Sequence, residues 1–376
     1  MALYDLAKPL LFSLPPETAH HLGINALKTG LPLYKKKTNN SPMLKTSLWG
    51  LEFSNPIGMA AGFDKNAEVI QPLFNMGFGF VEVGTVTPKA QEGNPCPRIF
   101  RNPKDIAVIN RMGFPNQGME RFLQRVLRYR DKQQNNPQNS EAPVGVLGIN
   151  IGMNKDQSEP AEDYCQLIHA LGPHADYLTI NISSPNTPGL RNLQEKTHFI
   201  NLIQIIKKSC IALESSISRA HPPLLVKLAP DLSEEQQQDL AQAALECGIQ
   251  GLILTNTTLS RPENLPESFA KETGGLSGGP LKDLSTEVIR SMFRKTQGKI
   301  PIIGVGGIAS GKDAYEKIKA GASLVQLYSA FIFQGPQITS QICSELEELL
   351  AQDGLRSIQD AIGLDASYEE AESAIA

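Results

Sequence analysis

The chain has 376 residues, of which 41% are hydrophobic and 20% are charged, a balance typical of globular proteins with one large domain or two smaller ones. Its formal net charge of −4 offers no basic surface for nucleic acid, so we expect no nucleic-acid partner. The five cysteines are scattered, without a C-x-x-C pair. This argues against a disulfide framework and, with the spacing of the six histidines, against a metal site.

Residues 1–40 precede the first predicted strand and contain two amphipathic patterns. Helices of this kind either pack against the rest of the protein or present an apolar surface to a membrane or a lipophilic ligand. The apolar residues of the first pattern are Leu3, Leu6, Leu10 and Leu11, and those of the second, which begins near Pro15, are Ala19, Leu22, Ala26 and Leu27.

Eight short apolar runs follow, each ending in small or polar residues. Each run is too short for a typical helix and is rich in valine, isoleucine and leucine without clean alternation, as is typical of strands buried on both faces. The runs cover residues 57–63, 80–86, 147–152, 177–182, 224–229, 251–257, 300–307 and 324–330.

Helical patterns lie between most of these runs. In residues 233–247, Ser233 is the expected N-cap and Gln236 lies in the first turn, ahead of one apolar face,. Similar patterns cover residues 286–296 and 311–320. The alternation indicates an α/β fold with parallel strands and right-handed crossovers. Eight repeats predict a closed (β/α)8 TIM barrel rather than an open sheet.

Two intervals are too long for a simple crossover. Residues 88–114 contain the strand-like stretches 97–101 and 107–110, which predict a β-hairpin insertion over the C-terminal mouth of the barrel. Residues 131–140 are polar and predict a loop. Residues 259–279 end in a glycine-rich stretch that indicates either a mobile lid or a plain surface loop.

Glycines and hydroxyls gather after the last two predicted strands. Residues 304–308 read Gly-Val-Gly-Gly-Ile at the end of the seventh run, and Tyr328 and Ser329 end the eighth. The loops at these two places often bind a phosphate in barrels of this kind, because glycines let backbone N–H groups approach the oxygens. We therefore expect a phosphate site here.

The segment 181–188, at the end of the fourth run, contains two carboxamides and three hydroxyls, together with two prolines that stiffen the turn. Carboxamides recognise planar amides or heteroaromatic rings, since each offers donors and an acceptor. A hydroxyl among them can act as a nucleophile or a base. The alternative is a polar turn in which asparagine and serine bond their own backbone.

The strand ends together bring amides, hydroxyls, two lysines and one acid to the same mouth. This set lacks the carboxylate pair of a glycosidase and the His/Asp/Glu cluster of a metal hydrolase. It suits a large planar cofactor with a phosphate tail, such as FMN, with Lys227 near the ring. The alternative for Lys227 is an ion pair with Asp231 or with another acidic residue.

Eight ordered blocks of the sequence match one known family pattern: 60–65, 82–88, 109–114, 181–190, 226–233, 255–258, 274–278 and 302–308. With these blocks the chain resembles class 2 dihydroorotate dehydrogenases, the membrane-associated, quinone-reducing class. The region around His20 resembles the N-terminal extension of that class, and class 1 members carry a cysteine where Ser184 stands. The chain departs from the family pattern at Met153, Pro115 and Gly279.

The resemblance implies a role for each matching residue. Ser184 would be the catalytic base, with Thr187 and Phe114 beside a water relay. FMN would be bound by Ala61, Gly62, Phe63, Asp64, Lys65, Thr85, Asn150, Asn181, Lys227, Thr255, Gly278, Gly307, Tyr328 and Ser329. Dihydroorotate would be held by Lys65, Asn110, Arg111, Met112, Gly113, Phe114, Asn181, Asn186, Asn256 and Thr257.

The resemblance also implies an activity and a place in the cell. Dihydroorotate would be oxidised to orotate, and a membrane quinone would receive the electrons. Residues 1–40 would form a helical extension for quinone access and peripheral contact with the cytoplasmic face of a bacterial membrane, residues 41–366 an FMN-binding barrel, and residues 367–376 a disordered tail. Two alternatives are an isomerase of a sugar phosphate and a binding barrel without catalysis.

Overall fold

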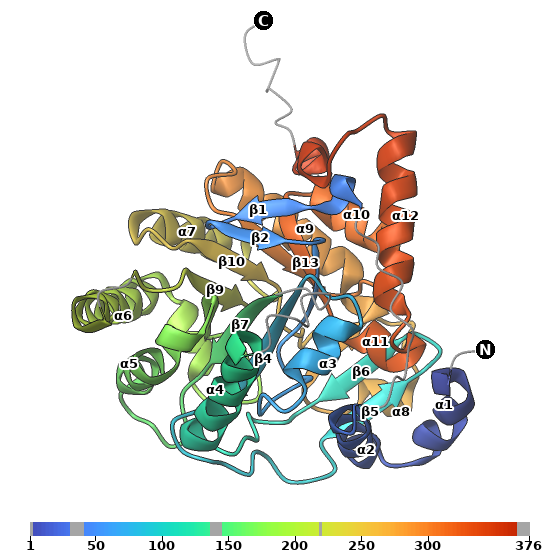
Figure 1. The fold of residues 1–376 in the computed structure, drawn as a ribbon, viewed down its shortest axis with the longest axis horizontal. Coiled ribbons are helices and arrows are strands. Elements are labelled where there is room, and N and C mark those ends of the chain that lie inside the picture. Colours follow the sequence, from blue (N-terminus) through green and yellow to red (C-terminus); the bar gives the residue numbers. More distant parts are fainter. Residues whose placement is uncertain (1–2, 31–40, 136–144, 218–219, 367–376) are drawn as a thin grey trace, which may run out of the picture.

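The computed structural model describes residues 3–30, 41–135, 145–217 and 220–366. Its centre is a closed barrel in the order β10-β12-β13-β3-β4-β7-β8-β9, with every neighbouring pair parallel. The predicted (β/α)8 fold is therefore confirmed (Figure 1). The strands are β3 (Ile57–Met59), β4 (Phe80–Val86), β7 (Val146–Ile151), β8 (Tyr177–Asn181), β9 (Leu224–Leu228), β10 (Gly251–Leu254), β12 (Ile302–Val305) and β13 (Ala322–Leu327).

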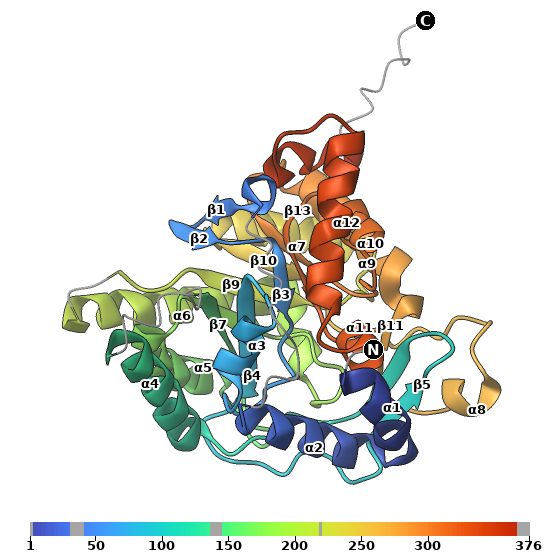
Figure 2. The same cartoon turned by 45° about the vertical axis from the view of Figure 1, so that its right-hand side comes forward.

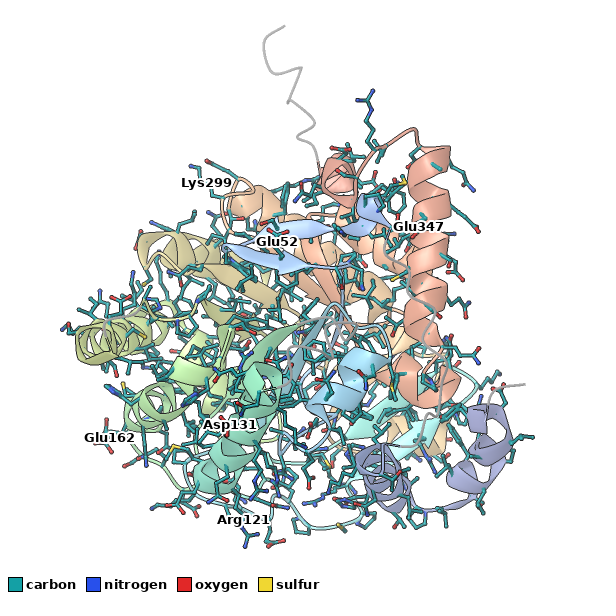
Figure 3. All side chains as sticks on the ribbon, viewed as in Figure 1. Glu52, Arg121, Asp131, Glu162, Lys299 and Glu347 are labelled. Atoms are coloured by element: carbon teal, nitrogen blue, oxygen red, sulfur yellow. The ribbon has the colours of Figure 1, made fainter. Side chains whose placement is uncertain are left out.

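Helices surround the barrel and turn their charged side chains outward, as the labelled Arg121 and Glu162 illustrate (Figure 3). In α7, the predicted N-cap is confirmed, because Ser233 and Gln236 form a capping box. The helices are α3 (Ile70–Asn75), α4 (Met119–Asn135), α5 (Pro160–Leu171), α6 (Lys196–Ile217), α7 (Glu234–Glu246), α8 (Glu267–Ala270), α9 (Lys282–Lys295), α10 (Gly311–Lys319), α11 (Ser329–Gln334) and α12 (Ile338–Gln352).

The amino-terminal end of the barrel is plugged. Strands β1 (Thr46–Leu48) and β2 (Leu51–Phe53) form a hairpin whose Trp49 donates a hydrogen bond of 2.7 Å from Nε1 to the carbonyl of Gln250. Phe53 packs edge-on against Phe80, and both belong to a buried apolar cluster inside the barrel. Side chains of the described residues therefore fill this end of the barrel.

The predicted hairpin insertion is present and gains a third strand. Strands β5 (Ile99–Asn102) and β6 (Ala107–Asn110) pair antiparallel, and β11 (Gly275–Gly278) adds to β6. Residues 275–278 are therefore neither a lid nor a plain surface loop. Leu276 is fully buried with residues of β6 and α8 in a small separate core, which explains why this glycine-rich segment is a strand.

The prediction of a polar loop over residues 131–140 is wrong in its first half. Helix α4 continues to Asn135, while residues 136–144 lie outside the described part of the chain. The helix buries Phe122, Val126 and Tyr129 on one face. Gln133 donates to the hydroxyl of Tyr129 at 2.6 Å. The other polar residues of this stretch, 131, 132, 134 and 135, are exposed and belong to the outer face of the helix.

Two helices, α1 (Leu3–Ser13) and α2 (Pro16–Lys28), lie beside β5 at the open end of the barrel (Figure 2). Glu17 of α2 pairs with Arg98 at 2.6 Å, and Ile24 is buried against the barrel. Leu6 and Leu10 are 65% and 68% exposed, so the helices pack with one face and leave leucines on the other. The described helices include none that is long and apolar enough to cross a membrane. Residues 31–40 and 367–376, including the predicted tail, lie outside the described part.

Candidate active site

A cavity of about 600 Å³ opens at the carboxyl ends of the barrel strands. Its floor is formed by strand residues such as Thr85, Asn181 and Lys227. Its roof comes from the segment after β6, and its outer part is lined by residues of α1 and α2, such as Leu11 and Ala19. The barrel mouth and the N-terminal helices therefore share one continuous space.

A second cavity of about 80 Å³ adjoins the first beside the glycine-rich loops after β11 and β12. Gly307 has a φ of +72°, and a Cβ there would lie 2.8 Å from the backbone nitrogen of Lys282. A Cβ on Gly278, whose φ is +93°, would lie 1.9 Å from the carbonyl oxygen of Ile106. Side chains are thus excluded from both positions, which leaves backbone groups to face a small anionic ligand.

Lys227 lies within β9 and is 5% exposed. Among the described residues, its ammonium has no hydrogen bond or salt bridge. Burial lowers the pKa of Lys227, while the negative charge of Glu82 acts in the opposite direction. The alternative pairing with Asp231 is wrong, because Asp231 pairs with Arg191 at 2.8 Å. A buried cation without a partner suits a ligand that carries negative charge.

Glu82 is fully buried inside the barrel. Its Oε1 accepts a hydrogen bond of 2.7 Å from Asn150, whose Oδ1 accepts from Thr85 at 2.6 Å and from Asn181 at 3.0 Å. Sequence reasoning assigned no role to Glu82. The available signal was a carboxylate in the middle of an otherwise apolar run, since a buried carboxylate needs partners.

Ser184 lies on the loop after β8, is 6% exposed and lines the large cavity. Its Oγ accepts a hydrogen bond of 3.2 Å from the backbone N–H of Asn186. Phe114 lines the same cavity and has a φ of +54°. The buried Oγ1 of Thr187 has no partner among the described residues. The backbone N–H of Ser183 likewise donates to Asn181 Oδ1 at 3.3 Å. The loop therefore bonds its own backbone, as the alternative of a polar turn predicted, and also forms part of the cavity wall.

Lys65 lies at the edge of the cavity, where its Nζ donates to the carbonyl of Gly62 at 2.7 Å. Burial lowers the pKa of Lys65 to about 8, with Glu17 opposing and Arg98 reinforcing the shift. His20 of α2 also lines the cavity. Burial lowers its pKa well below the ordinary value, so this ring is neutral near pH 7.

Most of the predicted site residues come together around the two cavities. Of the predicted cofactor residues, Ala61, Gly62, Phe63, Lys65, Thr85, Asn181, Lys227, Tyr328 and Ser329 line the large cavity, and Thr255, Gly278 and Gly307 line the small one. Of the predicted substrate residues, Lys65, Asn110, Met112, Gly113, Phe114, Asn181, Asn186, Asn256 and Thr257 line the large cavity.

Two predicted residues turn their side chains elsewhere. The carboxylate of Asp64 accepts hydrogen bonds of 2.8 Å from the backbone N–H groups of Glu68 and Val69. Arg111 pairs with Glu272 at 2.8 Å. Any contact of Asp64 or Arg111 with a ligand would therefore be made by the backbone. Asn150 and Thr187 also lie behind the cavity walls.

The sequence departs from the family pattern at three residues. Pro115 lines the large cavity and Gly279 the small one, whereas Met153 lines neither.

The family model described as dihydroorotate dehydrogenase matches residues 43–350. The chain belongs to the dihydroorotate dehydrogenase family. It is 50% identical over 362 residues to the dihydroorotate dehydrogenase (quinone) of Rhodospirillum rubrum, covering 96% of this chain and 94% of that protein. It is also 50% identical over 352 residues to the mitochondrial dihydroorotate dehydrogenase (quinone) of Mus musculus, covering 94% and 87% of the two chains.

Solved dihydroorotate dehydrogenase structures agree with this membership. The crystal structure of the Eimeria tenella enzyme in complex with ferulenol has a TM-score of 0.89 to this chain, with 42% sequence identity over 96% of this chain and 99% of that one. The resemblance to the quinone-dependent class is therefore confirmed. The described N-terminal helices and hairpin are thus features of a dihydroorotate dehydrogenase and not of an unrelated phosphate-binding barrel.

Proposed function

We propose that the protein oxidises dihydroorotate to orotate in pyrimidine biosynthesis, with FMN as hydride acceptor and a membrane quinone as final electron acceptor. The observation that carries the proposal is the buried, unpartnered ammonium of Lys227 at the floor of a cavity that adjoins the glycine-lined one. Family membership makes the cofactor a flavin, and the small glycine-lined cavity favours a flavin with a single terminal phosphate.

The residues present fit FMN. Lys227 would face the part of the ring that gains negative charge, and the carboxamide of Asn181 would face its polar edge. The backbone at Gly278 and Gly307 would hold the phosphate, with the hydroxyl of Ser329 beside it. When bound, the flavin supplies an acceptor for a hydride.

The substrate would be held under the segment after β6. Lys65 supplies a cation for the carboxylate, and the carboxamides of Asn110, Asn186 and Asn256 face the cavity where a planar amide ring would lie,. Asn186 is itself fixed, because its Nδ2 donates to the carbonyl of Asn110 at 3.1 Å. Such fixed donors orient the ring and stabilise the charge that develops on it.

The oxidation removes a proton from one carbon of the substrate and a hydride from its neighbour, and a carbon–carbon double bond forms between them. Ser184 Oγ would take the proton. A serine hydroxyl is a weak base, so its own proton must leave at the same time. The unpartnered Oγ1 of Thr187 offers a hydrogen-bonding group for a water on this route, and Phe114 would shield the route from bulk solvent.

The quinone would enter between the N-terminal helices. The large cavity continues to side chains of α1 and α2 such as Leu11, Ala19 and His20, so a quinone head group could approach the flavin from the side opposite the substrate. The quinone gains both electrons and two protons as it becomes a quinol. Arg101 donates to the carbonyls of Leu11, Phe12 and Leu14 and thereby holds α1 at the entrance.

We place the protein at the cytoplasmic face of a bacterial membrane as a peripheral protein. The exposed Leu6, Leu10 and Leu22 lie on the two helices that border the cavity, and apolar side chains of this kind can enter the head-group region of a bilayer. In this arrangement residues 1–40 serve quinone access and residues 41–366 form the FMN-binding unit.

The test is the colour of the purified protein and its response to each substrate. We expect a yellow protein with one FMN per chain, whose flavin absorption is bleached by dihydroorotate and restored by a quinone. A colourless, folded protein that refuses added FMN would refute the cofactor, and a yellow protein that dihydroorotate does not bleach would refute the substrate.

A further inference from the structure

A chain of hydrogen-bonded side chains, three of them carboxamides, begins at Glu82 in the barrel core and ends at Asn256 in the wall of the large cavity. We call it the amide chain. We propose that Glu82 is a positioning residue that fixes the orientation of this amide chain, and thereby decides which donors and acceptors are presented to the ligands. The inference rests on the proposed function, because it concerns the residues that would hold flavin and dihydroorotate.

Glu82 is anchored by several donors at once. Besides Asn150 at 2.7 Å, its carboxylate accepts hydrogen bonds from Gln326 Nε2 at 2.9 Å, from the hydroxyl of Tyr177 at 3.0 Å and from Thr179 Oγ1 at 3.2 Å. An ionised carboxylate can only accept. Each of these neighbours must therefore turn a donor toward Glu82, and hydrogen bonds to a charged group are the stronger kind.

The hydrogen bond between Asn150 and Glu82 determines the one between Asn150 and Asn181. Because Asn150 turns its Nδ2 toward Glu82, its Oδ1 faces the opposite way. That oxygen accepts hydrogen bonds from Thr85 Oγ1 at 2.6 Å and from Asn181 Nδ2 at 3.0 Å. A rotated Asn150 would set its Oδ1 against the carboxylate of Glu82 and its Nδ2 against the Nδ2 of Asn181. One carboxylate therefore determines the orientation of two carboxamides.

The orientation continues to the substrate side of the mouth. The Oδ1 of Asn181 accepts from Ser183 Oγ at 3.1 Å. Since the proton of Ser183 is used there, its oxygen accepts from Asn256 Nδ2 at 3.0 Å. The Oδ1 of Asn256 then accepts from the backbone N–H of Thr257 at 2.8 Å. Ser183 precedes Ser184 in the sequence, so the chain reaches from the barrel core to the loop that carries the proposed base.

Glu82 itself lines neither cavity, whereas Thr85, Asn181 and Asn256 line the large one. The carboxylate therefore acts on ligands through these three residues. Its negative charge also favours the ammonium form of Lys227. A merely structural carboxylate would affect stability only, but a positioning carboxylate would alter the affinity for FMN and the KM for dihydroorotate together.

The test is a compensating pair of substitutions. Glu82→Gln keeps the shape of the side chain but can present a donor to Asn150, so we expect the dissociation constant for FMN to rise roughly 10- to 100-fold, the effect of losing a hydrogen bond to a charged group. Asn150→Asp should also weaken binding, because it sets two carboxylates against each other. In the double variant the introduced carboxamide can donate to the introduced carboxylate, which still accepts from Thr85 and Asn181.

We therefore expect the double variant to bind FMN more tightly than either single variant, measured by titrating each apoprotein and following the quenching of flavin fluorescence. Tyr177→Phe is the matched control. It removes another buried donor to Glu82 outside the amide chain, and should lower thermal stability while leaving the FMN affinity close to that of the wild type.

Additive losses in the double variant, or unchanged FMN affinity in Glu82→Gln, would overturn the role of Glu82. If the wild type itself binds no FMN, the proposed function fails instead. NMR then still tests the orientation of the amide chain. The side-chain amide resonances of Asn150 and Asn181 should shift in Glu82→Gln, and the Asn181 resonance should return to its wild-type position in the double variant. No such shift would refute the chain directly.

Discussion

Arg191 Nη1 lies 2.8 Å from Asp231 Oδ2, and the same guanidinium joins two parts of the proposed site. Its Nε donates to the carbonyl of Ser183 at 3.0 Å and its Nη2 to the carbonyl of Thr257 at 3.0 Å. The loop that carries the proposed base and the loop after β10 that faces the substrate are therefore held at a fixed separation by one side chain.

We expect Arg191→Lys to slow the reduction of the flavin by dihydroorotate roughly 10- to 100-fold, a loss equivalent to about 1.5–3 kcal/mol, while the flavin stays bound. Lysine keeps the charge but cannot make three bonds in fixed directions. Stopped-flow absorbance measures the rate. Arg290→Lys on α9, where the arginine pairs with Glu287 of the same helix, is the control. Equal rates in the two variants would contradict a role for Arg191.

Ser184→Ala should bind FMN and dihydroorotate but reduce its flavin about 10²–10⁴-fold more slowly, the typical loss when a general base is removed. Ser184→Cys should recover part of the rate with a shifted pH dependence, since a thiolate is a competent base. Ser215→Ala, at an exposed position of α6, is the control. A normal rate in Ser184→Ala would transfer the role to Ser183 or Thr187.

The lowered pKa of Lys65 predicts that the reaction with dihydroorotate depends on pH. Its pKa is lowered to about 8, so below pH 8 the free enzyme offers an ammonium to the substrate carboxylate and above pH 8 it does not. We expect kcat/KM for dihydroorotate, which reports on the free enzyme, to fall as the pH rises through about 8. Lys65→Arg should remove this decline if it remains active. A decline at the same pH in Lys65→Arg would assign the titration to another group.

The same shift affects stability with a defined sign. The pKa of Lys65 is lower in the folded protein than the ordinary 10.5, so the unfolded state binds more protons between about pH 8 and 10.5. This lysine opposes folding below pH 8, and its contribution becomes less unfavourable as the pH rises through that window. Thermal unfolding of the wild type and of Lys65→Met as a function of pH would measure the difference.

Deletion of residues 1–40 should spare the reduction of FMN by dihydroorotate and abolish reoxidation by a long-tailed quinone. The substrate residues lie on barrel loops and on the segment after β6, whereas α1 and α2 border the outer cavity. Stopped-flow traces with each substrate would separate the two half-reactions. Equal loss of both would mean that the helices serve structure alone.

A milder change distinguishes membrane contact from quinone entry. Replacing the exposed Leu6 and Leu10 by serine should weaken binding to lipid vesicles, because each buried CH₂ contributes about 0.8 kcal/mol. Turnover with a short-chain, water-soluble quinone should be unchanged, since these side chains do not line the cavity. Vesicle flotation would test the first expectation, and undiminished flotation would remove these leucines from the membrane surface.

The sequence predicted the barrel well because each of its strands is buried on both faces and reads as a continuous apolar run. It did not predict the plug of β1 and β2, whose strands have three residues each and show no clear period. The hairpin was recognised, but its third strand was not, because β11 is glycine-rich and becomes a strand only by pairing with β6.

The features of the site that the sequence did not predict have a similar origin. The sequence assigned residues at strand ends to the mouth but did not predict the direction of each side chain. It therefore missed that Asp64 and Arg111 turn away to partners outside the cavity. The partners of Glu82 come from β7, β8 and β13, and only barrel closure brings them together. The links made by Arg191 also join loops that are distant in sequence, and no local pattern encodes them.

The attachment of the N-terminal helices has a consequence for synthesis of the protein. The hydroxyl of Tyr4 binds the carbonyl of Ile332, a residue 328 positions later, and β3 pairs with β13 to close the barrel. At roughly 5–20 residues per second, the helices leave the ribosome about a quarter of a minute to one minute before their docking surface is complete. During that time a chaperone or a bilayer can cover the leucines of the two helices. The nascent chain can therefore contact the membrane before the enzyme has folded.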